Sequence, residues 1–434
     1  MNDINEHITP SFKKTIIHFH PLDILKLLFY YSLFFVLIAP SLNESLNISF
    51  DFNIAKVSFF SALLIIKMCC GVELNAAWFF FLLSLIPSIL FNDIPVFFRP
   101  WTRFLYFFLL LAAIGPLFYN PKFNDIVHDL WKHFKIVVCT LTILSLLYYF
   151  IDRGNATHGG SNLPRGLFVH SMVLSPISGL STLFFFDLFT KSSSLKNKKI
   201  GLLFFGGLIT SFYTIIVSAS RIALLALICS LVAFILLSAK SVKKISFFIL
   251  AATIIVAFSS FIIRTELFSN IVTKFNADQD RSDSLLVSRK ILWDNRVVEF
   301  HSSPIYGIGF CSLDINDERL SFEGNFSSIE PGNSWLFVLS STGILGFACL
   351  FYCIFMEFFD LYKAKNSASQ QDVRMLLCLI VYFIIHMFAE GYVFSSGNVT
   401  CCFFWLILMF ADNCNKRIIL DQQPSASLLT PEKA

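Results

Sequence analysis

Charged residues are scarce in this sequence. Of its 434 residues only 14% are charged and 56% are hydrophobic, whereas a soluble domain carries about 25% charged residues. This shortage of charge excludes an ordinary soluble domain and indicates a membrane protein with many spans. The net charge of +4 is small and spread over the loops, so we expect no nucleic-acid partner.

Several motifs of well-known chemistry are missing. The sequence has no Gly-rich phosphate loop, nucleophile elbow or HExxH motif, which argues against ATP use and metalloprotease chemistry. Its eleven cysteines fall almost entirely in apolar runs, and no Cys/His spacing fits a zinc site. We therefore expect no disulfide framework, no metal and no cofactor. The polar first 21 residues and the long apolar run behind them predict no cleavable signal peptide.

Apolar runs of about 17 to 25 residues, the length that crosses a bilayer, recur along the chain. They predict an all-α polytopic fold with about twelve transmembrane helices. The second and third spans are separated only by Glu73-Leu74-Asn75. The predicted spans are 22–41, 55–72, 76–92, 103–119, 135–151, 168–190, 200–218, 222–239, 245–263, 333–359, 374–393 and 398–413.

The positions of lysine and arginine predict the topology, because cytoplasmic loops are enriched in both. With twelve spans the basic clusters fall on one side, which makes both termini cytoplasmic, although Arg99 and Arg103 lie on the other side. We expect four regions: transmembrane helices 1–9 in 1–263, a large outer loop in 264–332, helices 10–12 in 333–413, and a cytoplasmic tail in 414–434.

The large outer loop contains a predicted amphipathic helix. Residues 282–300, SDSLLVSRKILWDNRVVEF, place apolar residues at helical spacings behind a Ser-Asp start signal. Pro304, Gly307 and Gly309 then end the helix. The loop is followed by EPGNSWLFVLSSTGILG, residues 330–346, in which small residues interrupt an apolar run. This stretch is either the mouth of a membrane helix or part of an active site.

Four arginines lie on the predicted outer face. Arg165 closes the first outer loop, Arg221 begins the eighth span, and Arg289 and Arg296 lie two turns apart on one face of the loop helix. Each arginine either snorkels, pairs with a nearby carboxylate, or binds an anion. Four on one side favour a shared anion such as a diphosphate, which guanidinium binds through a planar fork.

Candidate acids and bases are fewer. Glu390 lies near the outer end of the eleventh predicted span, where a carboxylate is either functional or paired with an arginine. His301 directly follows the loop helix and is either a base or a solvated side chain.

Four blocks of the sequence resemble the bacterial O-antigen ligase and O-antigen polymerase (Wzy-type) superfamily of inner-membrane glycosyltransferases. They lie in the family's order and topological places, although each block is degenerate. The blocks are LPRGLFVHSMVLS, SASRIALLAL, SRKILWDNRVVEFHSSPIYGIGF and GNSWLFVLSSTGILGF, which together cover about residues 160 to 350.

The resemblance implies a GT-C-like architecture, a multi-pass location in the bacterial inner membrane, and a periplasmic site for sugars carried on undecaprenyl diphosphate. A chain-length regulator and a flippase are further partners that the family leads us to expect. Arg221 and Arg289 match the arginines that bind the lipid diphosphate. The catalytic candidates are Arg221, Arg289, Glu390 and His301, and the substrate-binding candidates are Arg165, Arg296, Asn333 and Trp335.

One departure from the ligase pattern favours a polymerase. Ligases of this family carry a histidine where this sequence has Gly332, and a Gly-x-x-Trp-Leu opening is typical of polymerases. The spacing from Arg296 to Gly307 is similar to that of polymerase outer loops, but the first outer loop does not repeat it, since Pro176 stands where glycine would follow Arg165. A ligase, a flippase or transporter for the same lipid-linked sugar, and a structural assembly partner remain alternatives.

Overall fold

The computed structural model describes most of the chain, and its secondary structure there is almost entirely helical. The described residues are 21–42, 52–157, 163–194, 198–238, 287–314, 331–366 and 370–422. Their long helices are α1 (Pro21–Ile38), α2 (Phe52–Cys69), α3 (Ala76–Leu90), α4 (Pro100–Ile114), α5 (Asn124–Ile151), α6 (Ser171–Ser194), α7 (Lys198–Val217), α8 (Arg221–Ser238), α11 (Val287–Ser302), α12 (Ser334–Lys363), α13 (Gln370–His386) and α14 (Val399–Gln422).

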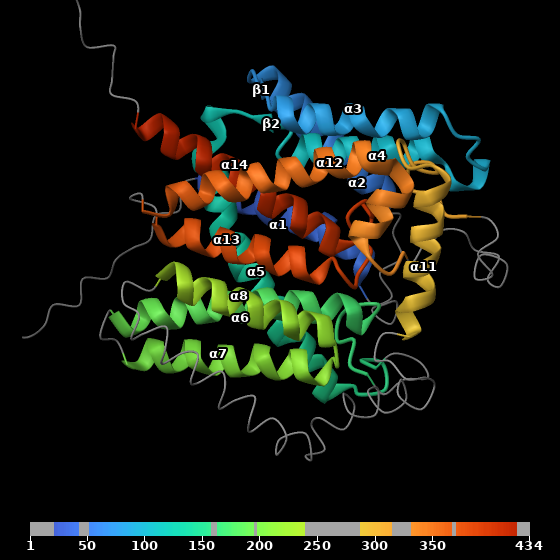
Figure 1. Cartoon of the computed structure of the whole chain (residues 1–434). Helices are drawn as coiled ribbons and strands as arrows, with labels where there is room; N and C mark the ends of the chain where they lie inside the picture. The colour runs from blue at the N-terminus through green and yellow to red at the C-terminus, as the bar shows by residue number, and fades with distance from the viewer. Residues whose placement is uncertain are drawn as a thin grey trace, which may run out of the picture.

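The helices form a bundle in which most axes run side by side, while α11 crosses one end (Figure 1). We call this the α11 end. The packed pairs include α6 with α7, α8 with α13, α3 with α12, and α2 with α4. The start of α12, the end of α13 and the turn between α7 and α8 all lie at the α11 end (Figure 1).

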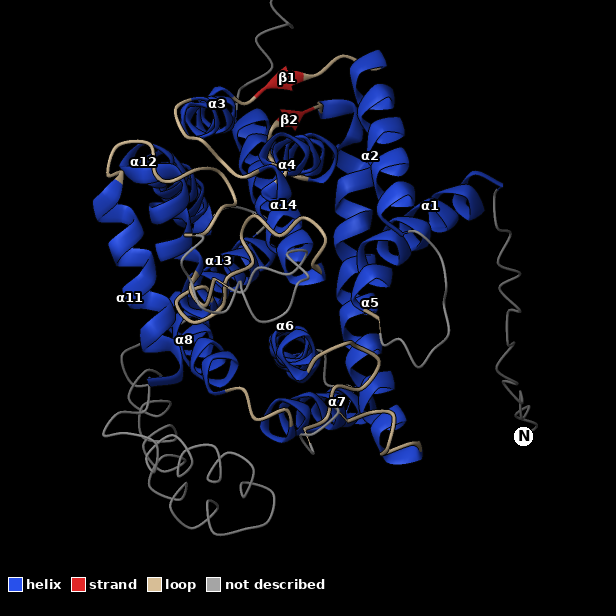
Figure 2. Ribbon diagram, turned by 90° about the vertical axis from the view of Figure 1, so that its right-hand side faces the viewer, coloured by secondary structure: helices blue, strands red, loops and turns tan. Residues whose placement is uncertain are grey.

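The centre of the bundle is α14, which other helices surround (Figure 2). Residues 401–408 of this helix are completely buried. Trp405 packs edge-on against Trp78 of α3 and Phe107 of α4. The outer helices instead expose apolar side chains, as Leu202 on α7 does at 71% of its surface. Apolar residues on both the inside and the outside are what a bundle surrounded by lipid requires.

Seven of the described helices are long and apolar enough to cross a membrane, an architecture consistent with a polytopic membrane protein. Eleven of the twelve predicted spans coincide with a helix, while span 245–263 lies outside the described residues. The exact number of spans and the GT-C-like architecture therefore stay predictions. The break predicted at Glu73-Leu74-Asn75 is confirmed, because Glu73–Leu74 forms β1, which pairs antiparallel with β2 (Phe118–Tyr119).

One predicted boundary is wrong in a way that affects the site. The span expected at 374–393 ends as a helix at His386, and α14 begins only at Val399. The apolar composition of 387–394 hid a set of tight turns, since main-chain hydrogen bonds such as Ser395 N to Tyr392 O replace the helical pattern. Glu390 consequently lies in a connecting loop and not in a membrane helix.

Candidate functional site

The stretch of small residues in 330–346 marks a break inside α12. The helix runs from Ser334 to Lys363, but Gly343 has φ +67° and ψ −170°, which is not helical. Just before the break the Ser341 and Thr342 hydroxyls donate to the carbonyls of Phe337 and Val338 at 2.6 and 2.7 Å. Such bonds one turn back tend to bend a helix.

The loop that follows α11 inserts its backbone into this break. Helix interruptions at membrane depth need new partners for the freed peptide groups, and the loop supplies them on both sides of Gly343. The bonds are Ile308 N to Ser340 O at 2.9 Å, Gly309 N to Ser341 O at 3.2 Å, Ile344 N to Pro304 O at 2.9 Å, and Leu345 N to Ile305 O at 3.2 Å.

Two glycines make this close approach feasible. A Cβ at Gly307 would lie 2.4 Å from the carbonyl carbon of Ser341, and a Cβ at Gly343 would lie 2.3 Å from the carbonyl oxygen of Ile305. Both glycines also have positive φ, a conformation that side chains disfavour. The Pro-x-x-Gly-x-Gly element and the small residues of α12 are thus two halves of one backbone joint.

Polar side chains from α3 and α4 hold the same loop from the other side. Asn92, just after α3, donates to the carbonyls of Gly307 and Ser88 at 2.9 and 2.8 Å. Arg103 of α4 donates to the carbonyl of Cys311 at 3.2 Å. This contact gives a structural reason for one of the two arginines that fell on the unexpected side of the predicted topology.

Beside the joint lies a buried ion pair between Arg296 and Glu299, a carboxylate that the sequence analysis did not single out. Arg296 and Glu299 on α11 are 2.8 Å apart, with side chains only 1% and 2% exposed. The Glu299 carboxylate also accepts from the amide of Asp314 at 2.8 Å. Burial raises the pKa of Glu299, while Arg296, the Asp314 amide and the Ser340 hydroxyl act to lower it. In the sequence, the i,i+3 spacing of Arg296 and Glu299 is the feature that indicates a possible ion pair.

Arg296 does not lie on an open surface where it could bind an anion. It pairs with a nearby carboxylate, which is one of the three options that we considered for each outer arginine. Arg289, two turns earlier, lies in the first turn of α11, but its side chain lies outside the described residues. We expected Arg289 and Arg296 to share one exposed face of α11, but at Arg296 this face is buried.

Arg221 is the first residue of α8 and follows a tight turn. Ala219 is buried in a left-handed conformation, φ +54°, and the Ser220 hydroxyl accepts from the amide of Ala223 at 3.4 Å, as a helix cap does. Figures 1 and 2 agree that α8 and α11 begin near one another at the α11 end. The two arginines expected to bind diphosphate thus belong to neighbouring helix starts.

Arg165 stabilises the first outer loop. Its amide donates to the carbonyl of Ala156 at 2.8 Å, and its Nε donates to the carbonyl of Asn155 at 3.1 Å. These contacts join Arg165 to residues 155 and 156 of the same loop.

The predicted substrate-binding residues at the start of α12 make structural contacts. The Asn333 side chain accepts from the amide of Leu336 at 3.0 Å and caps the helix. The indole of Trp335 donates to the carbonyl of Ile384 on α13 at 3.2 Å. Both residues fix α12 against its surroundings, and a contact of either with substrate stays a prediction.

Glu390 is held next to the start of α12 through its backbone. Its carbonyl accepts from the hydroxyl and the amide of Ser334 at 2.6 and 3.1 Å, and the Ser334 hydroxyl accepts from the amide of Tyr392 at 3.0 Å. His301 is exposed in the last turn of α11. Both candidate bases therefore lie at the α11 end.

Gly332 occupies a cramped position between α11 and α12. Its φ is +71°, and a Cβ there would lie 2.7 Å from Cδ1 of Leu292. Its carbonyl accepts from the indole of Trp293 at 3.3 Å. At this position the main chain, and not a side chain, faces α11.

Residues 206–351 match the family model described as O-antigen ligase. The match covers about a third of the chain and supports its membership of the O-antigen ligase and polymerase superfamily. The matched segment extends from α7 through the break in α12, so it contains the backbone joint and both helix starts that carry Arg221 and Arg289. Arg165 and Glu390 lie outside it. No curated protein matches the chain.

The backbone joint predicts that alanine is not tolerated at Gly343 or Gly307. Each variant should lose at least about 2 kcal/mol of stability, because a left-handed residue costs roughly 1–2 kcal/mol and forced overpacking about 1–3 kcal/mol. Gly206→Ala on α7 is the matched control, since a Cβ there meets nothing within 4 Å. Thermal unfolding of the purified protein in detergent measures the effect. Equal melting of all three variants would contradict the joint.

The buried ion pair predicts strong coupling between Arg296 and Glu299. Arg296→Met or Glu299→Leu alone should cost about 3–5 kcal/mol, because each leaves a buried charge without its partner. The double variant should recover much of that loss. Lys132→Met removes an exposed pair with Asp129 and should change stability by no more than about 1 kcal/mol. Additive losses in the double variant, measured by thermal unfolding, would show that the two charges act independently.

Proposed function

We propose that this membrane glycosyltransferase polymerises oligosaccharide repeat units carried on undecaprenyl diphosphate into O-antigen or a related surface polysaccharide. In this proposal the α11 end faces the periplasm and the helices cross the bacterial inner membrane. The basic residues support the orientation, because positive charge is enriched on the cytoplasmic side. Lys198 and Lys199 begin α7, and Lys416 and Arg417 lie in the last two turns of α14.

The reaction is a glycosyl transfer between two lipid-linked chains. A hydroxyl on the non-reducing sugar of one repeat unit attacks the anomeric carbon of the growing chain. The bond from that carbon to the diphosphate breaks, and undecaprenyl diphosphate leaves with the electron pair. The proton of the attacking hydroxyl passes to Glu390 or His301.

Arg221 and Arg289 stabilise the negative charge that develops on the leaving diphosphate. Positioned cations lower a barrier when charge appears near them in the transition state. The support for this assignment is that the two arginines begin neighbouring helices, α8 and α11, within the matched family segment. Arg296 acts in this proposal as a positioning residue, because it pairs with Glu299, and the Glu299 carboxylate binds the amide of Asp314 in the chain beyond the joint.

Gly332 is the observation that favours polymerase over ligase. The position of the ligase histidine is here a left-handed glycine whose Cβ would collide with Leu292. A histidine side chain would therefore not enter this place without moving α11. The ligase alternative, transfer of finished polysaccharide to the lipid A core, is favoured by the description of the matching family as O-antigen ligase.

Replacing the two arginines tests the role of the diphosphate site. Arg221→Ala and Arg289→Ala should each lower the amount of long polysaccharide by about 10²- to 10³-fold, the range found when one preorganised donor is lost. Arg153→Ala is the control, because Arg153 is exposed at the same end and contacts only the ring of Tyr149 among the interactions described. Wild-type chain lengths in both arginine variants would end the proposal.

A deletion strain separates the two activities. Loss of a polymerase should leave lipopolysaccharide whose core carries a single repeat unit, because ligation continues. Loss of a ligase should leave bare core, while polymer accumulates on undecaprenyl diphosphate. A silver-stained gel of the lipopolysaccharide, together with analysis of the lipid-linked polymer, shows which product forms.

A further inference from the structure

A lysine is buried in the flank of the bundle away from α11. Lys56 on α2 is only 6% exposed, and α2 lies on the opposite side of the bundle from α11 (Figure 2). Within the described part of the chain, no carboxylate lies at ion-pair distance from its ammonium group. A cation at membrane depth is costly unless something compensates its charge.

The contacts of Lys56 are all to neutral groups. Its Nζ donates to the carbonyl of Ser396 at 3.1 Å and to that of Gly397 at 3.4 Å. The remaining contact is Cys402 Sγ at 3.7 Å, and a thiol sulfur is a weak acceptor. Only one of the three contacts is short, so the ammonium group retains capacity for a stronger, charged acceptor.

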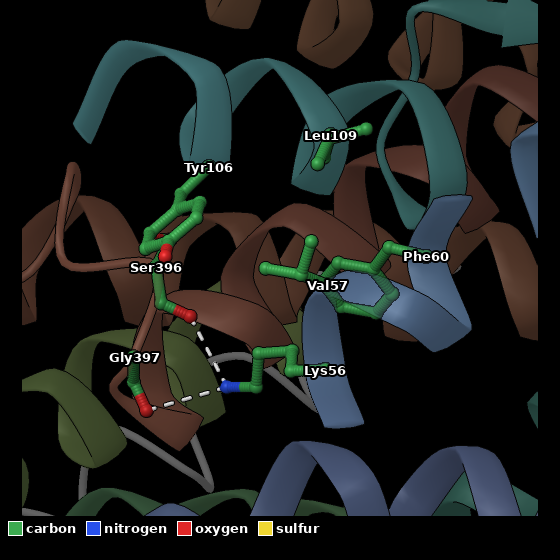
Figure 3. Close-up of a pocket in the computed structure, with 7 residues that line it drawn as sticks. All are labelled: Lys56, Val57, Phe60, Tyr106, Leu109, Ser396 and Gly397. Carbon is green, nitrogen blue, oxygen red and sulfur yellow. Dashed lines mark hydrogen bonds between the residues drawn. The ribbon is translucent and has the colours of Figure 1, made fainter. Parts of the chain in front are cut away.

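A hollow opens directly onto this lysine. It is open to the outside, with about 330 Å³ of empty space that includes the open part, and it is lined by Lys56, Val57, Phe60, Tyr106, Leu109, Ser396 and Gly397. The hydroxyl end of Tyr106 points toward Ser396 across the hollow (Figure 3). The polar groups thus gather on one side, whereas Val57, Phe60 and Leu109 form an apolar wall between α2 and α4.

The surface around the hollow is apolar. Ile54, Trp101 and Leu105 on α2 and α4 all expose more than half of their surface. In a membrane such a surface contacts acyl chains, and a tryptophan in the first turn of a helix is typical of the boundary with the headgroups. Lys56 lies on the second turn of α2 at the same end of the bundle, a depth that a lipid phosphate reaches.

We propose that this hollow binds the phosphate group of an anionic membrane lipid, with Lys56 as the cation and Tyr106 as a second donor. The acyl chains then lie over Ile54, Trp101 and Leu105. Basic pockets between transmembrane helices are a known way to bind lipid headgroups. The site is separate from the arginines at the starts of α8 and α11.

Binding is tested on the full chain in maltoside detergent, which carries no phosphate. Phosphatidylglycerol should raise the melting temperature and remain bound in native mass spectra. Lys56→Met should need at least about tenfold more lipid for half of the effect, as expected when a charge-assisted hydrogen bond is lost. Lys67→Met is the matched control, because Lys67 lies on the same helix and donates to the carbonyl of Ala112 instead.

Two further ligands identify the part of the lipid that is recognised. Diacylglycerol supplies acyl chains without phosphate and should not stabilise the protein. Inorganic phosphate supplies the anion without chains and should act only far above the lipid concentration. If either ligand matches phosphatidylglycerol, or if Lys56→Met responds as the wild type does, the proposed lipid site is wrong.

Two conservative variants keep the proposal testable if Lys56→Met does not fold. Lys56→Arg keeps the charge and should keep the lipid response. Tyr106→Phe removes only a hydroxyl from a half-exposed ring and should weaken the response about threefold to tenfold, the range for one hydrogen bond. An unchanged lipid response in Tyr106→Phe would remove Tyr106 from the site, and a lost response in Lys56→Arg would contradict recognition by charge.

Discussion

The backbone pairing at the break in α12 is the constraint on which the rest of this end of the molecule depends. Peptide groups in a membrane interior must find partners within the protein, so a helix can open there only where another segment completes its hydrogen bonds. The loop 303–309 does so on both sides of Gly343. Because that loop follows α11 without a gap, the same bonds fix where α11 ends and how it crosses the bundle.

The charged side chains around the joint help to hold α11 and the following loop in place. Arg296 and Glu299 are too well buried to gain much from their mutual attraction alone, since desolvation offsets it. Their effect is specificity: Glu299 also binds the amide of Asp314, so the pair ties the end of α11 to the chain that leaves the joint. Asn92 and Arg103 hold the loop from α3 and α4. A change in the backbone at the joint would therefore shift the helices that border the candidate site.

The helices are largely predictable from the sequence, because lipid imposes a length and a polarity that hydropathy records directly. The amphipathic helix in 282–300 corresponds to α11, whose described part begins at Val287. The predicted span is wrong where apolar residues form turns, as after His386, because hydropathy does not distinguish a buried turn from a helix. Glu299 was missed although its i,i+3 spacing from Arg296 is visible in the sequence, because only the structure shows that the pair is buried. Lys56 was missed because its importance comes from burial and from partners as distant as Ser396, which no local pattern reveals.

The same packing ranks the two candidate bases. A general base must keep its position relative to the reacting hydroxyl, since small displacements cost much of the rate. Glu390 meets this requirement through its main chain, which Ser334 holds by two hydrogen bonds, and Pro331 packs so closely on Gly391 that a Cβ there would lie 2.3 Å from the proline ring. His301 lies exposed at the end of α11 without comparable anchoring in the contacts described. Within the proposed mechanism, this anchoring and the glycine at position 332 favour Glu390 over His301 as the base.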